Sequence, residues 1–315
     1  MNLYQKTLSI IITILIFSSC EKVVYFEVET QENKLVVNSF IQPDSVGNMT
    51  ISLSVDPLAV GFENVRVETA AVYIYKNEEL IGNFVHLGDG NYFIDAASID
   101  PQPGDDFKIE ASAPGRETIT AETSIPSEVI IEEAKIIDTI FVHVSYSAID
   151  SMGNIFVIDT LVPHYKIQIT FIDPSGEDFY SLKINYKDAF SETYTCFSTD
   201  DPVFTLDGDY GFGGEGDDMV TLCDEVFFTD ITFEETKKTM TLSLLEIPTE
   251  FFIDPKFVLR LNHLSEAYYK YISTSSLQAS NQDNPFGEPV TVFSNINKGF
   301  GIFAGLNSSI AEIEL

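Results

Sequence analysis

The sequence is poor in basic residues, and this scarcity excludes two kinds of partner. It contains 17 Lys and Arg residues against 49 Asp and Glu residues, a formal net charge of −32 at pH 7. Binding to nucleic acid needs a basic patch that neutralises phosphates, so nucleic acid is excluded as a routine partner. The same charge excludes electrostatic attraction to anionic lipid. The plain interpretation of the acidity is solubility, and binding of a divalent cation or a cationic partner is the alternative.

Motifs that would indicate an enzyme are lacking as well. None of the four histidines lies in an HExxH motif or at a paired metal-ligand spacing, and no GxSxG nucleophile elbow is present. Chance pairs of carboxylates are common among 49 acidic side chains, so a glycosidase pair carries no weight. We therefore predict that the protein is not an enzyme. The alternative is a cell-envelope enzyme, such as a hydrolase, whose site is not visible in the linear sequence.

Long apolar runs are lacking after the first twenty residues. Met1–Lys6 is polar with one lysine, Thr7–Phe17 is apolar, and Ser18, Ser19 and Cys20 follow. This is the layout of a secretory signal peptide, and its apolar run is shorter than the ~20 residues that a membrane-spanning helix needs. We predict a signal peptide over residues 1–19 and a soluble chain after it.

Phe17-Ser18-Ser19-Cys20 resembles a bacterial lipobox, in which the cysteine is lipidated and becomes the first residue of the mature protein. The alternative is an ordinary signal peptide followed by a chance cysteine. Each buried methylene contributes about 0.8 kcal/mol, so two or more acyl chains on Cys20 would anchor the protein stably. Glu21, in place of aspartate, argues against retention in the inner membrane. We expect a lipidated tether over residues 20–33 and an outer-membrane location, on the cell surface or the periplasmic face.

Short alternating runs between turn residues fill residues 34–126. Met49–Val55 alternates cleanly, and about seven such runs occur at regular spacing. This pattern predicts an immunoglobulin-like β-sandwich. Ile125-Pro126-Ser127 is the expected boundary of the domain.

Residues 127–315 predict a second β-rich domain with one or two short helices, so the expected fold class is all-β. We expect Tyr165–Ile172 and Phe179–Tyr186 to form a hairpin around Asp173–Gly176, and Ser145–Asn154 to form a loop. Tyr268, Tyr271, Ile272 and Ser275 follow a helical period behind Ser265, which can cap the helix. The runs at Pro289–Phe293, Phe300–Leu306 and Ile310–Leu315 predict strands.

Only two cysteines remain if Cys20 is lipidated. Cys196 and Cys223 allow one pairing, and export to an oxidising compartment favours a disulfide between them. The segment that they enclose is rich in glycine and carboxylates, including Asp207, Asp209, Asp217 and Asp218. A solvated acidic loop is one interpretation, and calcium binding by these four aspartates is the other, because calcium prefers oxygen ligands in flexible loops.

The most specific pattern apart from Cys20 lies near the C-terminus. It comprises Leu264–Tyr271, Asn284–Val290 and Ser294–Phe303, with Leu35–Asn38 and Asp173-Pro174 ahead of Phe179-Tyr180. Together these segments resemble the Bacteroidota lipoprotein family called domain of unknown function 4249. The resemblance covers nearly the whole mature chain. It implies an outer-membrane lipoprotein that works with a TonB-dependent transporter, and it supplies no catalytic residues.

Overall fold

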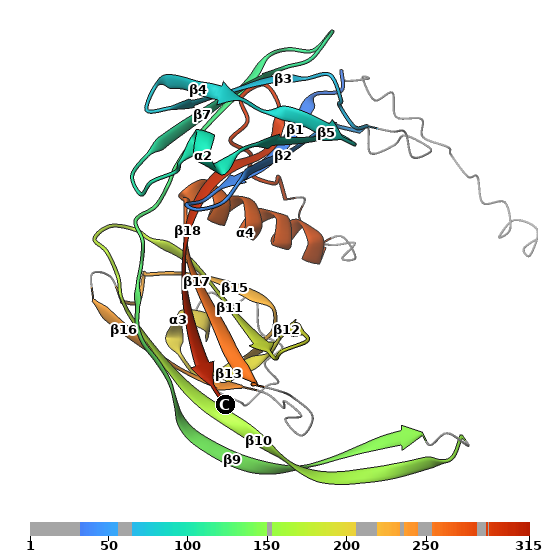
Figure 1. Ribbon diagram of the computed structural model, residues 1–315, viewed down its shortest axis with the longest axis vertical. Helices are drawn as coiled ribbons and strands as arrows, with labels where there is room; N and C mark the ends of the chain where they lie inside the picture. Colours follow the sequence, from blue (N-terminus) through green and yellow to red (C-terminus); the bar gives the residue numbers. More distant parts are fainter. Residues whose placement is uncertain are drawn as a thin grey trace, which may run out of the picture. The chain divides into compact units, whose positions relative to one another are not determined.

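The computed structural model describes residues 32–55, 65–149, 153–205, 219–233, 236–244, 254–281, 288 and 290–315. All the strands and helices described below belong to one compact unit, Asn33–Val55 together with Val60–Leu315. The chain is nearly all β, which confirms the predicted fold class (Figure 1). No helix within these residues has the length and apolar character needed to cross a membrane.

The first core lies between two sheets formed by the N-terminal strands. One sheet contains β1 (Leu35–Ile41), β2 (Gly47–Leu53), β6 (Asn91–Ile94) and β5 (Val85–Gly88). The other contains β4 (Glu79–Asn83), β3 (Ala71–Lys76), β7 (Asp106–Ser112) and β8 (Ile119–Ser124), and the short helix α2 spans Ala96–Ile99. Alternate residues of these strands, such as Val37, Ile74 and Ile109, are fully buried in one cluster. The alternation in the sequence thus produces a sandwich, because successive strand residues face opposite sides of a sheet.

The second core lies between a five-stranded sheet and a further part of the first sheet. The five strands are β14 (Val220–Leu222), β13 (Phe197–Thr199), β16 (Lys237–Leu244), β10 (Ile155–Ile172) and β9 (Ile131–Ile149). They pack against β11 (Phe179–Lys187), β15 (Glu225–Thr229) and β17 (Lys256–Leu264), with β12 (Glu192–Tyr194) beside β11. The short helix α3 spans Pro202–Thr205. The side chains of Phe171, Tyr180 and Phe257 are fully buried in this cluster.

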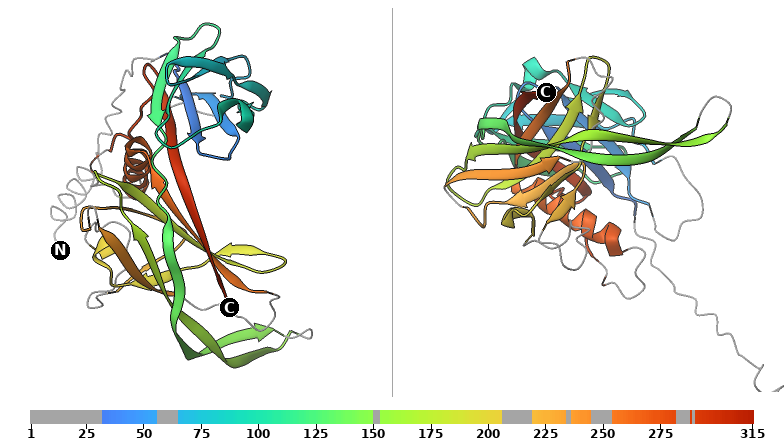
Figure 2. Two further views of the ribbon diagram at one scale, coloured as in Figure 1. Left: turned by 60° about the vertical axis from the view of Figure 1, so that its left-hand side comes forward. Right: turned by 90° about the horizontal axis from the view of Figure 1, so that it is seen from below.

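The C-terminal strand β18 (Phe300–Glu314) joins the two cores (Figures 1 and 2). Its first half pairs in parallel with β1, from Val36↔Phe300 to Ile41↔Gly305. Its second half pairs in antiparallel fashion with β17. Phe303 accordingly belongs to the first core and Ile313 to the second. The two runs predicted at the C-terminus are therefore one strand, whose two halves pair with different neighbours.

The predicted helix is present as α4 (Glu266–Asn281). Its tyrosines face the sheet: Tyr268 contacts Phe40 and Phe227, and Tyr269 contacts Phe179. The Ser265 backbone carbonyl accepts hydrogen bonds from the first turn, but its buried hydroxyl has no hydrogen-bond partner in the part of the chain that the structure describes. The predicted side-chain cap is therefore wrong.

Three other local predictions are wrong. Residues 290–293 form no strand. Ser145–Ile149 is strand, because the pairing of β9 with β10 continues as far as Ile149↔Ile155. β10 pairs with β9 and β16, whereas β11 pairs with β12, β15 and β17. Residues 173–178 therefore cross from one sheet to the other instead of closing a hairpin.

Candidate functional site

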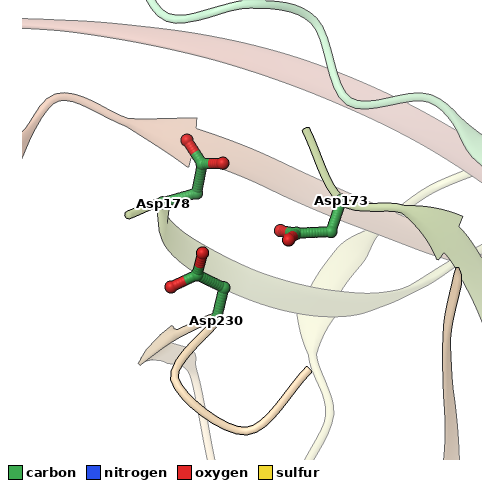
Figure 3. Close-up of side chains that lie close together, drawn as sticks. All are labelled: Asp173, Asp178 and Asp230. Atoms are coloured by element: carbon green, nitrogen blue, oxygen red, sulfur yellow. The ribbon is translucent and has the colours of Figure 1, made fainter. Parts of the chain in front are cut away.

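Three aspartates meet where the chain crosses between the sheets (Figure 3). Asp173 follows β10, Asp178 precedes β11 and Asp230 follows β15. One carboxylate oxygen from each lies within 4.8 Å of those of the other two. Asp173 and Asp230 are buried, and Asp178 is partly buried. We call this group the aspartate cluster.

Strand pairing holds two members of the cluster side by side. Phe179 pairs with Thr229 at the end of the β11–β15 ladder, so the residues just beyond them lie opposite each other. The backbone N–H of Asp230 donates to the carbonyl of Asp178 over 3.3 Å. Asp173 is fixed separately by its N–H, which donates to the carbonyl of Thr236 over 3.2 Å. The cluster thus has a rigid backbone frame drawn from both sheets of the second core.

Two buried aromatic side chains, Tyr180 and His263, form hydrogen bonds to the aspartate cluster. The hydroxyl of Tyr180 donates to Oδ1 of Asp173 over 2.5 Å, and Nε2 of His263 lies 2.8 Å from Oδ1 of Asp178. The two rings stack with centroids 5.2 Å apart. Burial and the hydrogen bond to the Asp173 carboxylate raise the pKa of Tyr180, so its hydroxyl stays protonated and remains a donor.

His263 lies between Asp178 and Ser127, but this line of residues is not a nucleophile arrangement. Nδ1 of His263 is 2.8 Å from the backbone carbonyl of Ser127 and 3.4 Å from its hydroxyl. A carbonyl can only accept, so Nδ1 must carry a hydrogen and cannot take the proton of the Ser127 hydroxyl. A serine nucleophile needs that nitrogen as its base. Nδ1 therefore donates to the carbonyl of Ser127, and the hydrogen bond between Nε2 of His263 and Oδ1 of Asp178 holds Asp178 in place.

The negative charge of the cluster is incompletely offset by its neighbours. Oδ2 of Asp178 and Oδ2 of Asp230 are buried and have no hydrogen-bond partner among the described residues. Within the same part of the chain, neither residue forms an ion pair with a lysine or arginine. Burial is the main cause that raises the pKa of Asp230, and the charges of Asp173 and Asp178 add to it against opposing backbone hydrogen bonds. Such a group either takes up a proton or binds a cation.

A pocket of about 360 Å³ lies directly beside the cluster. Asp178 and His263 form part of its wall, together with Glu177 and Ser265. Asp178 thus belongs to both the pocket and the cluster, whereas Asp173 and Asp230 do not line the pocket.

The structure bears on only part of the site predicted from sequence. Cys196 and Cys223 form a disulfide, as predicted, and it extends the β13–β14 pair by one position. Cys20 and the four loop aspartates Asp207, Asp209, Asp217 and Asp218 lie outside the described residues, so lipidation and a calcium-binding loop stay predictions. The aspartate cluster was missed because Asp230 comes from a segment that is distant in sequence from Asp173 and Asp178. The one available signal was Asp173-Pro174, which formed part of the family resemblance.

Fold and site together define an all-β protein with two cores and a buried carboxylate cluster. The family model described as "Domain of unknown function (DUF4249)" matches residues 21–310, so the chain belongs to that family. No curated protein matches the sequence.

Two solved structures are similar to parts of the chain. One is a DUF4785 family protein from Legionella pneumophila, with 11% identity and a TM-score of 0.21 over 72% of this chain and 52% of that protein. The other is a mutant of Salmonella alpha-2-macroglobulin, with 9% identity and a TM-score of 0.23 over 91% of this chain and 15% of that protein. The chain thus spans about half the length of the Legionella protein. At these scores neither similarity carries a functional argument.

Proposed function

We propose that this protein is a lipid-anchored lipoprotein of the outer membrane that works with a TonB-dependent transporter in ligand capture or uptake. It acts by binding and not by catalysis. The anchor is supported by the apolar run that ends at Cys20 and by the family match, which begins at the next residue, Glu21. The family domain is thus the part that remains after cleavage before Cys20.

The observation that carries the partnership is the outer part of the β9–β10 hairpin. β16 pairs with β10 only over Lys166–Ile172, whereas β9 pairs with β10 as far as Ile155. Residues 139–149 and 155–165 therefore form a ribbon in which, among the described residues, β9 and β10 pair only with each other (Figure 2). Two-stranded ribbons are marginally stable in water by themselves. A partner that covers this ribbon would stabilise it.

Both faces of the ribbon expose large apolar side chains. The strand register places Phe141, Val157 and Leu161 on one face, with exposed fractions of 66%, 67% and 50%. Ile140 and Phe156 lie on the other face and are exposed as well. Contiguous exposed apolar surface is typical of protein-contact sites, and isolated exposed residues are not. In this proposal the ribbon is the surface that contacts the transporter.

Loss of the lipid acceptor tests the anchor. The Cys20→Ala substitution, combined with Phe141→Asp/Leu161→Asp so that the proposed transporter contact is also lost, should move the protein from the membrane fraction to the soluble fraction. A variant that stays in membranes washed with high salt would rule out the anchor.

Charged substitutions in the ribbon test the partnership. Gently solubilised native membranes should yield the wild-type protein together with a barrel protein, identified by mass spectrometry. The Phe141→Asp/Leu161→Asp variant should remain in the membrane but lose that barrel protein. Phe190→Asp is the matched control, because Phe190 is 82% exposed and lies outside the ribbon. Recovery of a monomer or of a dimer of this chain alone from wild-type membranes would contradict the proposal.

A further inference from the structure

We propose that Asp173, Asp178 and Asp230 bind a calcium ion. This site is separate from the acidic loop between the two cysteines and from the membrane anchor. It rests on the geometry of the cluster and on the two carboxylate oxygens that have no other partner.

The unpartnered oxygens indicate a ligand. Asp230 is 3% exposed, and its Oδ2 makes no hydrogen bond within the described residues. Oδ2 of Asp178 is also buried and makes no hydrogen bond within the described residues, whereas Oδ1 of Asp178 is bonded to His263. Buried carboxylate oxygens without donors are strongly unfavourable unless a cation or a proton satisfies them. The close-up shows the three carboxylates directed toward a common space (Figure 3).

A cation fits this space better than a proton. A proton shared between two carboxylates requires the two oxygens to approach to about 2.5–2.7 Å, and it leaves the third negative charge in place. A central cation instead attracts all three oxygens at once. It tolerates the observed spread, in which the donor atoms lie within 4.8 Å of one another.

The donor set favours calcium over other divalent ions. Calcium accepts several carboxylates in flexible geometry, whereas magnesium demands near-ideal octahedral geometry and usually binds only one or two carboxylates with several waters. Zinc prefers nitrogen and sulfur, and both ring nitrogens of His263 are already engaged. The neighbouring pocket is lined by Asp178 and lies beside the cluster.

Thermal unfolding of the mature chain measures calcium binding directly. The melting temperature should rise by about 5 °C between excess chelator and saturating calcium chloride, and by much less with magnesium chloride. The Asp230→Asn variant should lose this rise. The matched control replaces Asp207, Asp209, Asp217 and Asp218 with Asn, and it should keep the rise.

A luminescence measurement on the wild-type protein covers the case in which Asp230→Asn does not fold. Terbium(III) chloride replaces calcium and is sensitised by a nearby tyrosine. Tyr180 is bonded to Asp173, so excitation of tyrosine should give terbium emission that added calcium suppresses. The variant that replaces Asp207, Asp209, Asp217 and Asp218 with Asn should keep this emission.

Four results would overturn the proposal. They are an equal melting temperature in calcium and chelator, an equal response to magnesium, a calcium response that persists in Asp230→Asn, and a response that disappears only in the loop variant.

Discussion

Asn295 bonds to both backbone polar atoms of Phe303. The N–H of Phe303 donates to Oδ1 of Asn295 over 3.0 Å, and Nδ2 of Asn295 donates to the carbonyl of Phe303 over 2.7 Å. Nδ2 also donates to the carbonyl of Glu122 in β8 over 3.0 Å. One amide side chain thereby connects the segment before β18 with β18 itself and with the opposite sheet of the first core.

Removing this amide should destabilise the first core. Asn295→Ala leaves two carbonyls and one N–H without their partner, and we expect a loss of about 1–3 kcal/mol in the free energy of unfolding. Asn297→Ala is the control, because its exposed side chain makes one 3.5 Å contact with Thr120, and it should cost less than about 0.5 kcal/mol. Urea unfolding of both variants measures the difference. Equal midpoints would contradict the bridging role of Asn295.

Gly301 should tolerate no side chain. It has a φ of +101°, and an added Cβ would lie 2.0 Å from the carbonyl oxygen of Val37, its partner in β1. Both the strained backbone and the clash act against Gly301→Ala, so the free energy of unfolding should fall by more than about 3 kcal/mol.

Gly115 provides the comparison for Gly301. Its φ is +70°, but an added Cβ would meet no atom within 4 Å. Gly115→Ala should therefore show only the backbone term of about 1–2 kcal/mol. Thermal or urea unfolding of the two variants separates strain from steric overlap. Similar losses in both would mean that β1 and β18 can move apart at little cost.

The disulfide between Cys196 and Cys223 should stabilise the second core. The two cysteines are 27 positions apart, and a bridge over a loop of this length stabilises by about 3–4 kcal/mol on the chain-entropy estimate. The Cys196→Ser/Cys223→Ser variant should unfold at a lower urea concentration, and its free energy of unfolding should be lower by about 3–4 kcal/mol. Wild type under reducing conditions should match the variant. A difference between these two would point to an effect of the serines themselves.

Asp105 should make stability depend on pH. Burial acts to raise the pKa of its carboxyl, but hydrogen bonds from Lys76, Asn77 and the backbone N–H of Gln102 outweigh burial and lower that pKa below its ordinary value of 3.8. The folded pKa is thus below the unfolded one, so the stabilisation is present above the unfolded value and is lost as pH falls through the folded value.

The Asp105→Asn variant tests this linkage. It should be less stable than wild type at pH 7, and the difference should shrink as the pH falls below about 3.9, the unfolded value. Asp106→Asn is the control, because Asp106 is the exposed neighbour of Asp105 and its substitution measures the effect of removing a carboxylate from this surface. Thermal melts of the three proteins at several pH values measure the difference. A gap that widens with acid would show that the sign is wrong.

Local sequence patterns were sufficient for much of the fold. Alternation predicted strands such as β1, β2 and β3, because one face of each is buried and the period of a strand is two. The tyrosine spacing predicted α4 for the corresponding reason with a period of 3.6. The pairing of Cys196 with Cys223 followed from the cysteine count, since no third cysteine competes if Cys20 is lipidated.

Tertiary structure decided which strands pair and which side chains meet. The alternation in Tyr165–Ile172 says that one face is buried, but it does not say that the partners are β9 and β16 instead of β11. β18 pairs with a strand more than 250 positions earlier, which no local pattern encodes. The aspartate cluster arises from the same long-range pairing, because the β11–β15 register places Asp178 beside Asp230 and the crossing after β10 adds Asp173. Periodicity fixes which face of a strand is buried, whereas register and neighbour choice depend on the packing of distant segments, and the site exists only where those segments meet.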